Sequence, residues 1–412
     1  MISERLLALV RCPACHGTLA GDRSSLRCTQ CGLAYGGEST DFLDLRPHEA
    51  FAERTKYLDE ALHADARHER VSPPLLGSKI RNDMLRAFLA PQPDDVVADL
   101  GCGSGRALLW NRDWQARAVG IDISPFFAQE ARAEVDLLLG DLRRLPFEDG
   151  AFTKAYSLDV LEHLSPDALA GMLREAARVL APGGQLFVYT HVRKNAAIAA
   201  GLRAINALAR QLERMGLIDM RQERLRKSDH LNPLADIPEL RRVAAAAGFR
   251  VRAIRYYTPI VGGFVENILM RLAEKRLADH ARNAGRAGGG VAGAVGASGA
   301  GRTGGVGSRS PADADGAGGT GAMTEEEALR AARAAGKDRV AKSASTRALL
   351  RALTAAMKLD LVLFGRIESG PFFALLEREP ATAPGSPVAG PGSLVSGPGS
   401  LAPGPGSQTP GP

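Results

Sequence analysis

Four of the five cysteines stand in two matched pairs near the start of the chain. Cys12 and Cys15 form one CxxC unit, Cys28 and Cys31 form another, and twelve residues separate the units. This spacing can bring four thiolates to a tetrahedron around zinc, with bonds of about 2.3 Å. We therefore predict a structural zinc ribbon over residues 1–45. Docking of a substrate or partner is the alternative role for this module.

A glycine-rich turn follows a run of apolar residues in VVADLGCGSGR. The run predicts a buried strand that ends at Asp99. Gly101, Gly103 and Gly105 then let the backbone turn sharply and approach a ligand without an intervening Cβ. Because Arg106 stands where a dinucleotide fingerprint has its third glycine, the turn argues against NAD.

Two more acids end the next two predicted strands. Asp122 comes 21 residues after Gly101, where a carboxylate can accept hydrogen bonds from both hydroxyls of a ribose. Asp141 ends the following strand with Leu142 beside it, a pair suited to the amine and the flat face of adenine. The three strand ends together predict a nucleoside-binding edge.

A further titratable cluster follows the fourth predicted strand. Asp159, Glu162 and His163 stand close together in DVLEH, and we take them as the candidate catalytic residues. The alternative is that Glu162 and His163 cap and orient the next helix. His191 and His230 are weaker candidates for a base that lines the same pocket.

These side chains need a scaffold that brings strand ends to one edge. Strands are predicted at 96–100, 118–122, 135–141, 151–159 and 185–191, with helices at 76–90 and 166–180. Such alternation predicts an α/β fold with a doubly wound, mostly parallel sheet.

Six motifs then occur in order along this scaffold. They are Asp99-Leu-Gly-Cys-Gly-Ser-Gly105, Gly-Ile-Asp122, Gly-Asp141-Leu, Leu-Pro-Phe147, Asp159-Val-Leu-Glu-His163 and Arg178-Val-Leu-Ala-Pro-Gly-Gly184. Together they resemble the class I S-adenosylmethionine-dependent methyltransferases, most of all the type 11 branch that includes enzymes of ubiquinone and menaquinone biosynthesis. The resemblance covers residues 76–260 and resumes near 357–379.

The resemblance implies a seven-stranded, Rossmann-like sheet that finishes with an antiparallel hairpin, and it implies S-adenosylmethionine as the methyl donor. The first acid would face the methionine amine, the second the ribose and the third the adenine. The implied donor-binding residues are Asp99, Gly101, Gly103, Gly105, Asp122, Ile123, Asp141, Leu142 and Leu158.

Two further implications concern metals. The pattern of Asp159, Glu162 and His163 is similar to a divalent-metal site in some quinone-pathway O-methyltransferases, although Asp159 replaces a glutamate. The cysteine module resembles short zinc ribbons on rRNA guanine methyltransferases and in small activator proteins of methyltransferases. The net charge of −1 over residues 1–45 favours a structural role over a grip on RNA.

The remaining segments complete the predicted organisation. A helical linker is expected at 46–75, the methyltransferase domain at 76–260 and a helical insertion at 261–370. The insertion contains a disordered glycine-rich tract at 285–322. Residues 371–379 supply the last strand, and 380–412 form a disordered tail with Pro-Gly-Ser repeats.

The distribution of charge along the chain indicates the kind of acceptor to expect. Residues 184–280 carry a net charge of +8, and a predicted helix at 195–218 places Arg203, Arg210 and Arg214 opposite an apolar face. We therefore expect a small, anionic or lipid-like acceptor in a cytoplasmic protein, with peripheral contact to the inner membrane surface as an option. An rRNA or tRNA base methyltransferase and a non-catalytic binding or activator protein are the alternatives.

Overall fold

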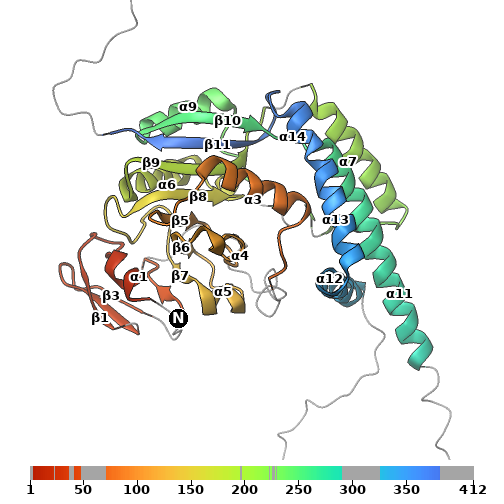
Figure 1. Ribbon diagram of the computed structural model, residues 1–412, viewed down its shortest axis with the longest axis horizontal. Helices are drawn as coiled ribbons and strands as arrows, with labels where there is room; N and C mark the ends of the chain where they lie inside the picture. Colours follow the sequence, from red (N-terminus) through yellow and green to blue (C-terminus); the bar gives the residue numbers. More distant parts are fainter. Residues whose placement is uncertain are drawn as a thin grey trace, which may run out of the picture. The chain divides into compact units, whose positions relative to one another are not determined.

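The computed structural model in Figure 1 describes residues 3–22, 24–36, 41–47, 71–194, 197–221, 223–224, 228, 230–289 and 325–380. Most of the linker expected at 46–75 lies outside these residues. So do the part of the expected glycine-rich tract that follows residue 289 and the tail from residue 381 onwards. Residues 71–75 are described and form no helix.

The cysteine module begins with a short helix and continues as a three-stranded antiparallel sheet. Helix α1 (Glu4–Leu9) precedes β1 (Leu19–Asp22), β2 (Ser25–Cys28) and β3 (Ala34–Tyr35), which pair in the order β1-β2-β3. Ser3 caps the helix, because its Oγ accepts a hydrogen bond from the Leu6 N–H at 3.0 Å.

The central sheet has eight strands in the order β10-β11-β9-β8-β5-β6-β7-β4. All pairings are parallel except those of β11 with its two neighbours. The strands are β4 (Leu43–Asp44), β5 (Val96–Leu100), β6 (Arg117–Asp122), β7 (Asp136–Leu139), β8 (Phe152–Leu158), β9 (Leu180–His191), β10 (Phe249–Tyr256) and β11 (Pro371–Arg378).

The mostly parallel α/β sheet predicted from the sequence is confirmed, with two differences. β4 adds an eighth strand beyond the predicted seven, because a two-residue segment at the end of the cysteine module pairs in parallel with β7. β9 begins at Leu180, five residues before the predicted start, because Leu180 already pairs with Phe152; residues 181–184 form an irregularity before regular pairing with β8 resumes at Gln185.

Helices cover both faces of the sheet (Figure 1). Those described are α3 (Leu76–Leu89), α4 (Arg106–Trp110), α5 (Gln129–Glu134), α6 (Pro166–Val179), α7 (Ala199–Arg214), α9 (Ile237–Ala246), α10 (Ile260–Phe264), the π-helical turn η4 (Val265–Met270), α11 (Arg271–Gly289), α12 (Glu325–Lys342), α13 (Ala344–Met357) and α14 (Leu359–Phe364). α11 extends through residues 285–289, the first five residues of the tract expected to be disordered.

Alternation along β5 divides the core between the two faces. Ala98 and Leu100 pack in a cluster with α6, α9 and the cysteine module, whereas Val97 packs with α3, α13 and α14. Because neighbouring residues of a strand point to opposite faces, an apolar run such as VVADL suits a strand that is covered on both sides.

The cysteine module and the central sheet share one hydrophobic core. Val10 forms an antiparallel bridge with Phe147, and the Leu45 N–H donates to the Leu139 carbonyl at 2.9 Å. The Ser3 hydroxyl also donates to the Asp136 carboxylate at 2.6 Å. These contacts reach β7 and the loop after it, so the module is built onto the sheet edge.

The segment between β10 and β11 brings added helices back to the sheet. β11 lies between β9 and β10 and is antiparallel to both. In Figure 1, α7, α11 and α13 lie together on one side of the sheet, and α13 packs against α3. Across the described ranges, each helix is too short or too polar to span a bilayer.

Candidate functional site

The glycine-rich turn joins β5 to α4 at the carboxyl edge of the sheet. Gly101 has φ +86°, and a Cβ there would meet Val160 Cγ2 at 2.5 Å. Gly103 has φ +53° and nothing within 4 Å of its missing side chain. The first glycine is therefore required for packing, and the second leaves backbone open to the cavity described below.

Asp122 holds this turn from the end of β6. Its carboxylate accepts hydrogen bonds from the Gly103 N–H at 2.7 Å and the Ser124 N–H at 2.9 Å. Burial raises the pKa of Asp122 above its usual value, although these backbone donors oppose the shift. Ile123 lies beside it in the cavity wall.

Asp141 and Leu142 also line the cavity, just beyond β7. The Asp141 carboxylate is nearly buried and accepts a bidentate contact from the guanidinium of Arg143, with Nη2 at 2.7 Å from Oδ2. Arg143 therefore neutralises the third acid of the edge in this structure.

Asp99 and Gly105 occupy a different place from the other implied donor residues. Neither is among the cavity-lining residues. The Asp99 side chain lies under the turn with 2% exposure, and burial raises its pKa to about 8. Gly105, at φ +80°, packs where a Cβ would meet Ala131 at 2.8 Å. Both residues support the turn from below.

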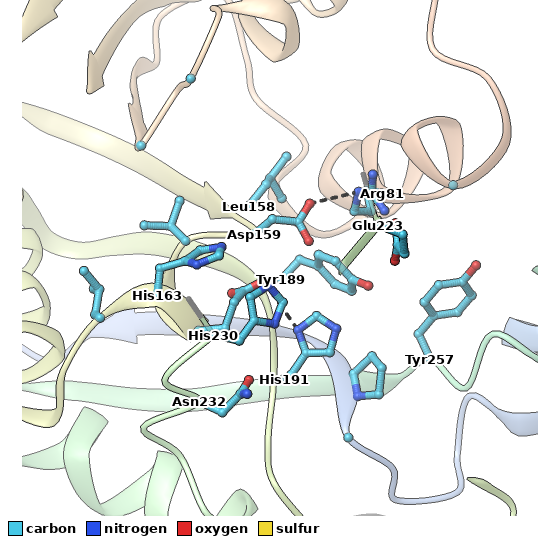
Figure 2. A pocket seen from close by; sticks show the side chains of 18 of the residues that line it. Arg81, Leu158, Asp159, His163, Tyr189, His191, Glu223, His230, Asn232 and Tyr257 are labelled. Atoms are coloured by element: carbon cyan, nitrogen blue, oxygen red, sulfur yellow. Dashed lines mark ion pairs between the residues drawn. The ribbon is translucent and has the colours of Figure 1, made fainter. Parts of the chain in front are cut away.

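The cavity measures about 1180 Å³ and has two halves. The turn and the ends of β6 and β7 line the first half, together with Leu158, Val160 and Leu164. The second half is lined from α3, α7, α10, η4 and α11, and from the ends of β9 and β11. Figure 2 shows titratable side chains that converge in this cavity, and we take this place as the boundary between the halves.

Asp159 stands at this boundary in a strained conformation. Its φ is +56°, unusual for a residue with a Cβ. Its Oδ2 lies 3.3 Å from Nε of Arg81, whose guanidinium lies over the Tyr189 ring (Figure 2). Burial and the nearby Glu162 raise the pKa of Asp159 despite Arg81. The carboxylate thus faces an arginine that the sequence analysis did not identify.

Glu162 is buried in the cavity wall and contacts two residues of β9. Its Oε2 accepts a hydrogen bond from the Thr190 hydroxyl at 2.9 Å, and its Oε1 lies 3.5 Å from Nδ1 of His191. Glu162 is 1% exposed, yet its pKa is lowered because the contacts with His191 and Thr190 outweigh burial. It is therefore a carboxylate that faces the imidazole of His191.

The imidazole ring of His163 contacts the ring of His230, which lies in a loop distant in sequence. The backbone N–H groups of Leu231 and Asn232 donate to the Glu162 carbonyl at 2.8 and 2.9 Å. These bonds place the His230 ring centroid 4.6 Å from that of His163, nearly perpendicular to it (Figure 2).

This contact changes the metal site implied by the sequence. Ligand atoms of Glu162, His163 and His230 lie within 4.8 Å of one another, whereas Asp159 lies outside this group. Two imidazoles and one carboxylate form a donor set for Zn²⁺, Fe²⁺ or Mn²⁺ more than for Mg²⁺. The structure thus groups Glu162 and His163 with His230, which a loop supplies, and places Asp159 against Arg81.

Several cavity residues were missed from the sequence. Arg81, Tyr189, Tyr257, Glu266 and Arg271 all line the second half. Arg81 and Glu266 follow apolar residues in ordinary helical patterns, and nothing local distinguishes them from solvated charges. Only the packing of α3 against η4, with the Gly77 N–H donating to Glu266 at 3.0 Å, brings these elements together.

The helix expected at 195–218 is observed as α7, Ala199–Arg214, with residues 195–196 outside the described part of the chain. Leu202 and Asn206 reach the cavity. Two residues of its expected apolar face, Leu208 and Met215, are instead 47% and 62% exposed. The arginines of its basic face are exposed and do not line the cavity: Arg203, Arg210 and Arg214.

The four cysteines of the N-terminal module converge as the spacing predicts. The Sγ atoms of Cys12 and Cys31 lie 3.6 Å apart, and those of Cys15 and Cys28 lie 3.4 Å apart. The backbone N–H groups of Cys31 and Gln30 lower the pKa of Cys28 to about 6. These separations fit sulfurs on the corners of one tetrahedron with bonds of about 2.3 Å.

Comparison with known proteins finds relatives over part of the chain. A probable tRNA methyltransferase 9B of Mus musculus is 38% identical over 108 residues, which is 26% of this chain and 24% of that protein. The ubiquinone biosynthesis O-methyltransferase of Xanthomonas oryzae is 33% identical over 126 residues, 29% of this chain and 52% of that protein. The chain thus spans about a quarter of the first of these relatives and about half of the second.

Among solved structures, a complex of the Haloferax volcanii Trm112 methyltransferase activator with a putative methyltransferase is similar at 24% identity and a TM-score of 0.34, covering 49% of this chain and 80% of that chain. Family models match two segments: "Trm112p-like protein" at residues 3–35 and "Methyltransferase domain" at residues 98–188. The chain therefore carries a methyltransferase domain behind a Trm112p-like zinc-ribbon segment, as the motifs predicted.

Proposed function

We propose that this protein is an S-adenosylmethionine-dependent methyltransferase. One observation carries the proposal: the glycine turn, Asp122 and Asp141 line the same cavity as the buried carboxylate of Glu162 and the partly exposed imidazole of His191, which face each other. The match of residues 98–188 to a methyltransferase domain supports it.

In this proposal the donor occupies the first half of the cavity. Asp122 accepts hydrogen bonds from the ribose hydroxyls, and Asp141 with Leu142 contacts the adenine. The open backbone at Gly103 lies against the donor, with Ile123 and Leu158 as apolar walls. Asp99, Gly101 and Gly105 act indirectly, by holding the turn in shape.

S-adenosylmethionine supplies a methyl group that a nucleophile can displace from sulfur. An oxygen or nitrogen of the acceptor forms the new bond to carbon, the carbon–sulfur bond breaks, and the acceptor loses a proton. His191 is placed to take that proton through Nε2, because Glu162 faces Nδ1 and favours a proton there. Glu162 is then a positioning residue, and His191 is the catalytic base.

Asp159 and His163 complete the proposed catalytic group. Asp159 orients Arg81 over the Tyr189 ring, at the point where donor and acceptor would meet. His163 lies on the donor side and fixes His230 by ring contact. If Glu162, His163 and His230 hold a divalent ion, activity will fall on treatment with EDTA and return on addition of that ion.

We assign a small, anionic or lipid-like acceptor to the second half of the cavity. Arg81 and Arg271 offer guanidinium groups there, each beside a carboxylate (Asp159 and Glu274), while Tyr257, Leu202 and Met270 supply apolar surface. Helices from the chain after β9 line this half. A walled cavity of this kind suits a compact acceptor better than an extended polymer.

An RNA base is the second candidate acceptor. The Trm112p-like segment and the tRNA methyltransferase relative favour it. Recognition of a flipped base would use the same cavity, with phosphates held outside it.

The N-terminal module is proposed to hold one structural Zn²⁺ through Cys12, Cys15, Cys28 and Cys31. The short sulfur–sulfur separations support this site. Its ion would stabilise a module whose core is continuous with that of the methyltransferase domain.

The decisive experiment uses the purified full chain with S-adenosylmethionine labelled on the methyl group. Separate lysate fractions of small molecules, lipids and RNA serve as acceptors. We expect label in the small-molecule or lipid fraction that His191→Gln abolishes. Label confined to RNA, and lost after ribonuclease treatment, would favour the second candidate. Binding of donor with no transfer to any fraction would favour a non-catalytic protein.

A further inference from the structure

Helices α13 and α14 form one nearly continuous helix, with only Lys358 between them. Its inner side carries Leu350, Thr354, Met357 and Leu361, which are buried. This side packs against α3 and α10. The helix is therefore attached to the rest of the protein through the packing of one apolar side.

The opposite side is apolar as well. Its residues follow one another at spacings of three and four, and all are exposed: Ala348, Ala352, Ala355, Leu359, Val362 and Leu363, flanked by Leu349 and Ile367. We call these eight residues the outer face. Val362 is 72% and Leu363 is 59% exposed. A surface helix of a globular protein ordinarily has polar residues there.

Charge along this helix has one sign. Arg351, Lys358 and Arg366 border the outer face, and Arg351 and Arg366 make no ion pair with a described residue. The only acid between residues 344 and 367 is Asp360, which is fully buried. Its carboxylate caps α10 by accepting hydrogen bonds from the N–H groups of Val261 and Gly262. The outer face is thus apolar, and cations predominate at its border: Arg351 and Arg366 lie there, Lys358 pairs with Asp83 at 2.6 Å, and the exposed Glu368 follows Ile367.

We propose that the outer face of α13 and α14 lies on an anionic lipid surface. Apolar side chains enter the interface while the bordering bases contact acidic headgroups, as in interfacial amphipathic helices. A second copy of the chain fits less well, because a twofold contact brings together two faces with more exposed bases, Arg351 and Arg366, than exposed acids, Glu368.

The location of the surface links it to the cavity. Asp360 fixes α10, and α10 supplies Gly263 to the cavity wall next to Tyr257 and Pro259. A membrane-held acceptor would therefore approach within one helix of its site. The surface itself goes beyond the proposed methyl transfer and does not depend on it.

The test is flotation of the full-length protein with vesicles, without donor. One vesicle population is pure phosphatidylcholine, and the other contains phosphatidylglycerol as roughly a third of the lipid. We expect binding to the anionic vesicles only. Val362→Asp with Leu363→Asp should lower the bound fraction at least tenfold, because two carboxylates would enter the interface.

Two further variants keep the test decisive. Arg351→Gln with Arg366→Gln leaves the apolar residues in place and should lower affinity for anionic vesicles by roughly tenfold or more. Leu208→Asp with Met215→Asp changes two exposed apolar residues on and directly after α7, 47% and 62% exposed, and should have no effect. Binding of S-adenosylhomocysteine reports folding of each variant and separates this proposal from the proposed function.

The proposal is overturned if the protein does not bind anionic vesicles, or if the α7 variant loses binding while the α14 variant keeps it. It is also overturned if light scattering finds a dimer without lipid that Val362→Asp with Leu363→Asp converts to a monomer. That result would make the outer face a subunit interface.

Discussion

Loss of the proposed zinc should weaken donor binding, although the metal site and the donor site are separate. Cys28→Ser removes one of the four thiolates and should release the ion. The module then loses its fold, because a segment of this size depends on metal for stability. A module joined by a flexible tether would leave donor affinity unchanged.

The structure gives the size of the expected effect. The module contributes Leu6, Val10, Leu43 and Leu45 to the shared core, each almost fully buried. Burial of one such side chain stabilises by about 1.5–3 kcal/mol. Unfolding of the module also frees β7, whose end carries Asp141. Because a hydrogen bond to a charged group contributes about 1.5–3 kcal/mol, partial loss of that contact should weaken donor binding roughly tenfold.

The assay is calorimetric titration of S-adenosylhomocysteine into wild-type and variant protein, with metal content measured by elemental analysis. Ser25→Ala is the matched control, because Ser25 is an exposed residue of the same module. Metal loss with donor affinity within twofold of wild type would refute the reasoning. It would show that β7 keeps its place without the module.

Three more outcomes are expected. Asp122→Asn should weaken donor affinity by about 1.5–3 kcal/mol in calorimetry, because one acceptor oxygen for ribose is lost; tighter binding of NAD than of S-adenosylhomocysteine would contradict the donor assignment. His191→Gln should lower turnover about 10²–10⁴-fold with donor affinity unchanged, and Glu162→Gln should lower it less; a normal rate in His191→Gln would remove the base. Asp99 has a folded-state pKa of about 8, above its unfolded value. Between these two pKa values the folded state binds one more proton than the unfolded state. The free energy of unfolding should therefore fall by about 1.4 kcal/mol per pH unit as pH rises from 6 to 7.5. Urea unfolding of Asp99→Asn should lack that slope, and an equal slope in both proteins would place the titration elsewhere.

The sequence by itself determined the features whose physical demands are local. Gly101 and Gly103 take positive φ values that a residue with a Cβ rarely adopts, so the turn was predictable from its glycines. Apolar runs determined the strands, and the alternation of strands with helices determined a parallel sheet. Cys12 through Cys31 determined a four-sulfur site, because few other geometries satisfy two CxxC units at that spacing.

The second half of the cavity was decided by tertiary structure alone. Asp159 and His163 were visible in their motif, but their partners Arg81 and His230 are far away in sequence and reach them through helix packing and a docked loop. Glu162 was assigned to catalysis or metal binding, and its contact with His191 exists only because β8 and β9 pair in one register. The pattern of residues along the sequence does not show which residues of two separate strands will pair.

The difference between local sequence signals and tertiary packing also explains β4 and the outer face. Two residues are too few to show a strand period, so β4 exists because the cysteine module packs on β7. The sequence of α13 and α14 shows apolar residues around the whole helix, and only packing against α3 and α10 decides which side is buried. Backbone preference and periodicity act over a few residues and are written in the sequence. Pairing between distant segments depends on the whole fold, and it is the fold that selects which charges, imidazoles and apolar faces meet.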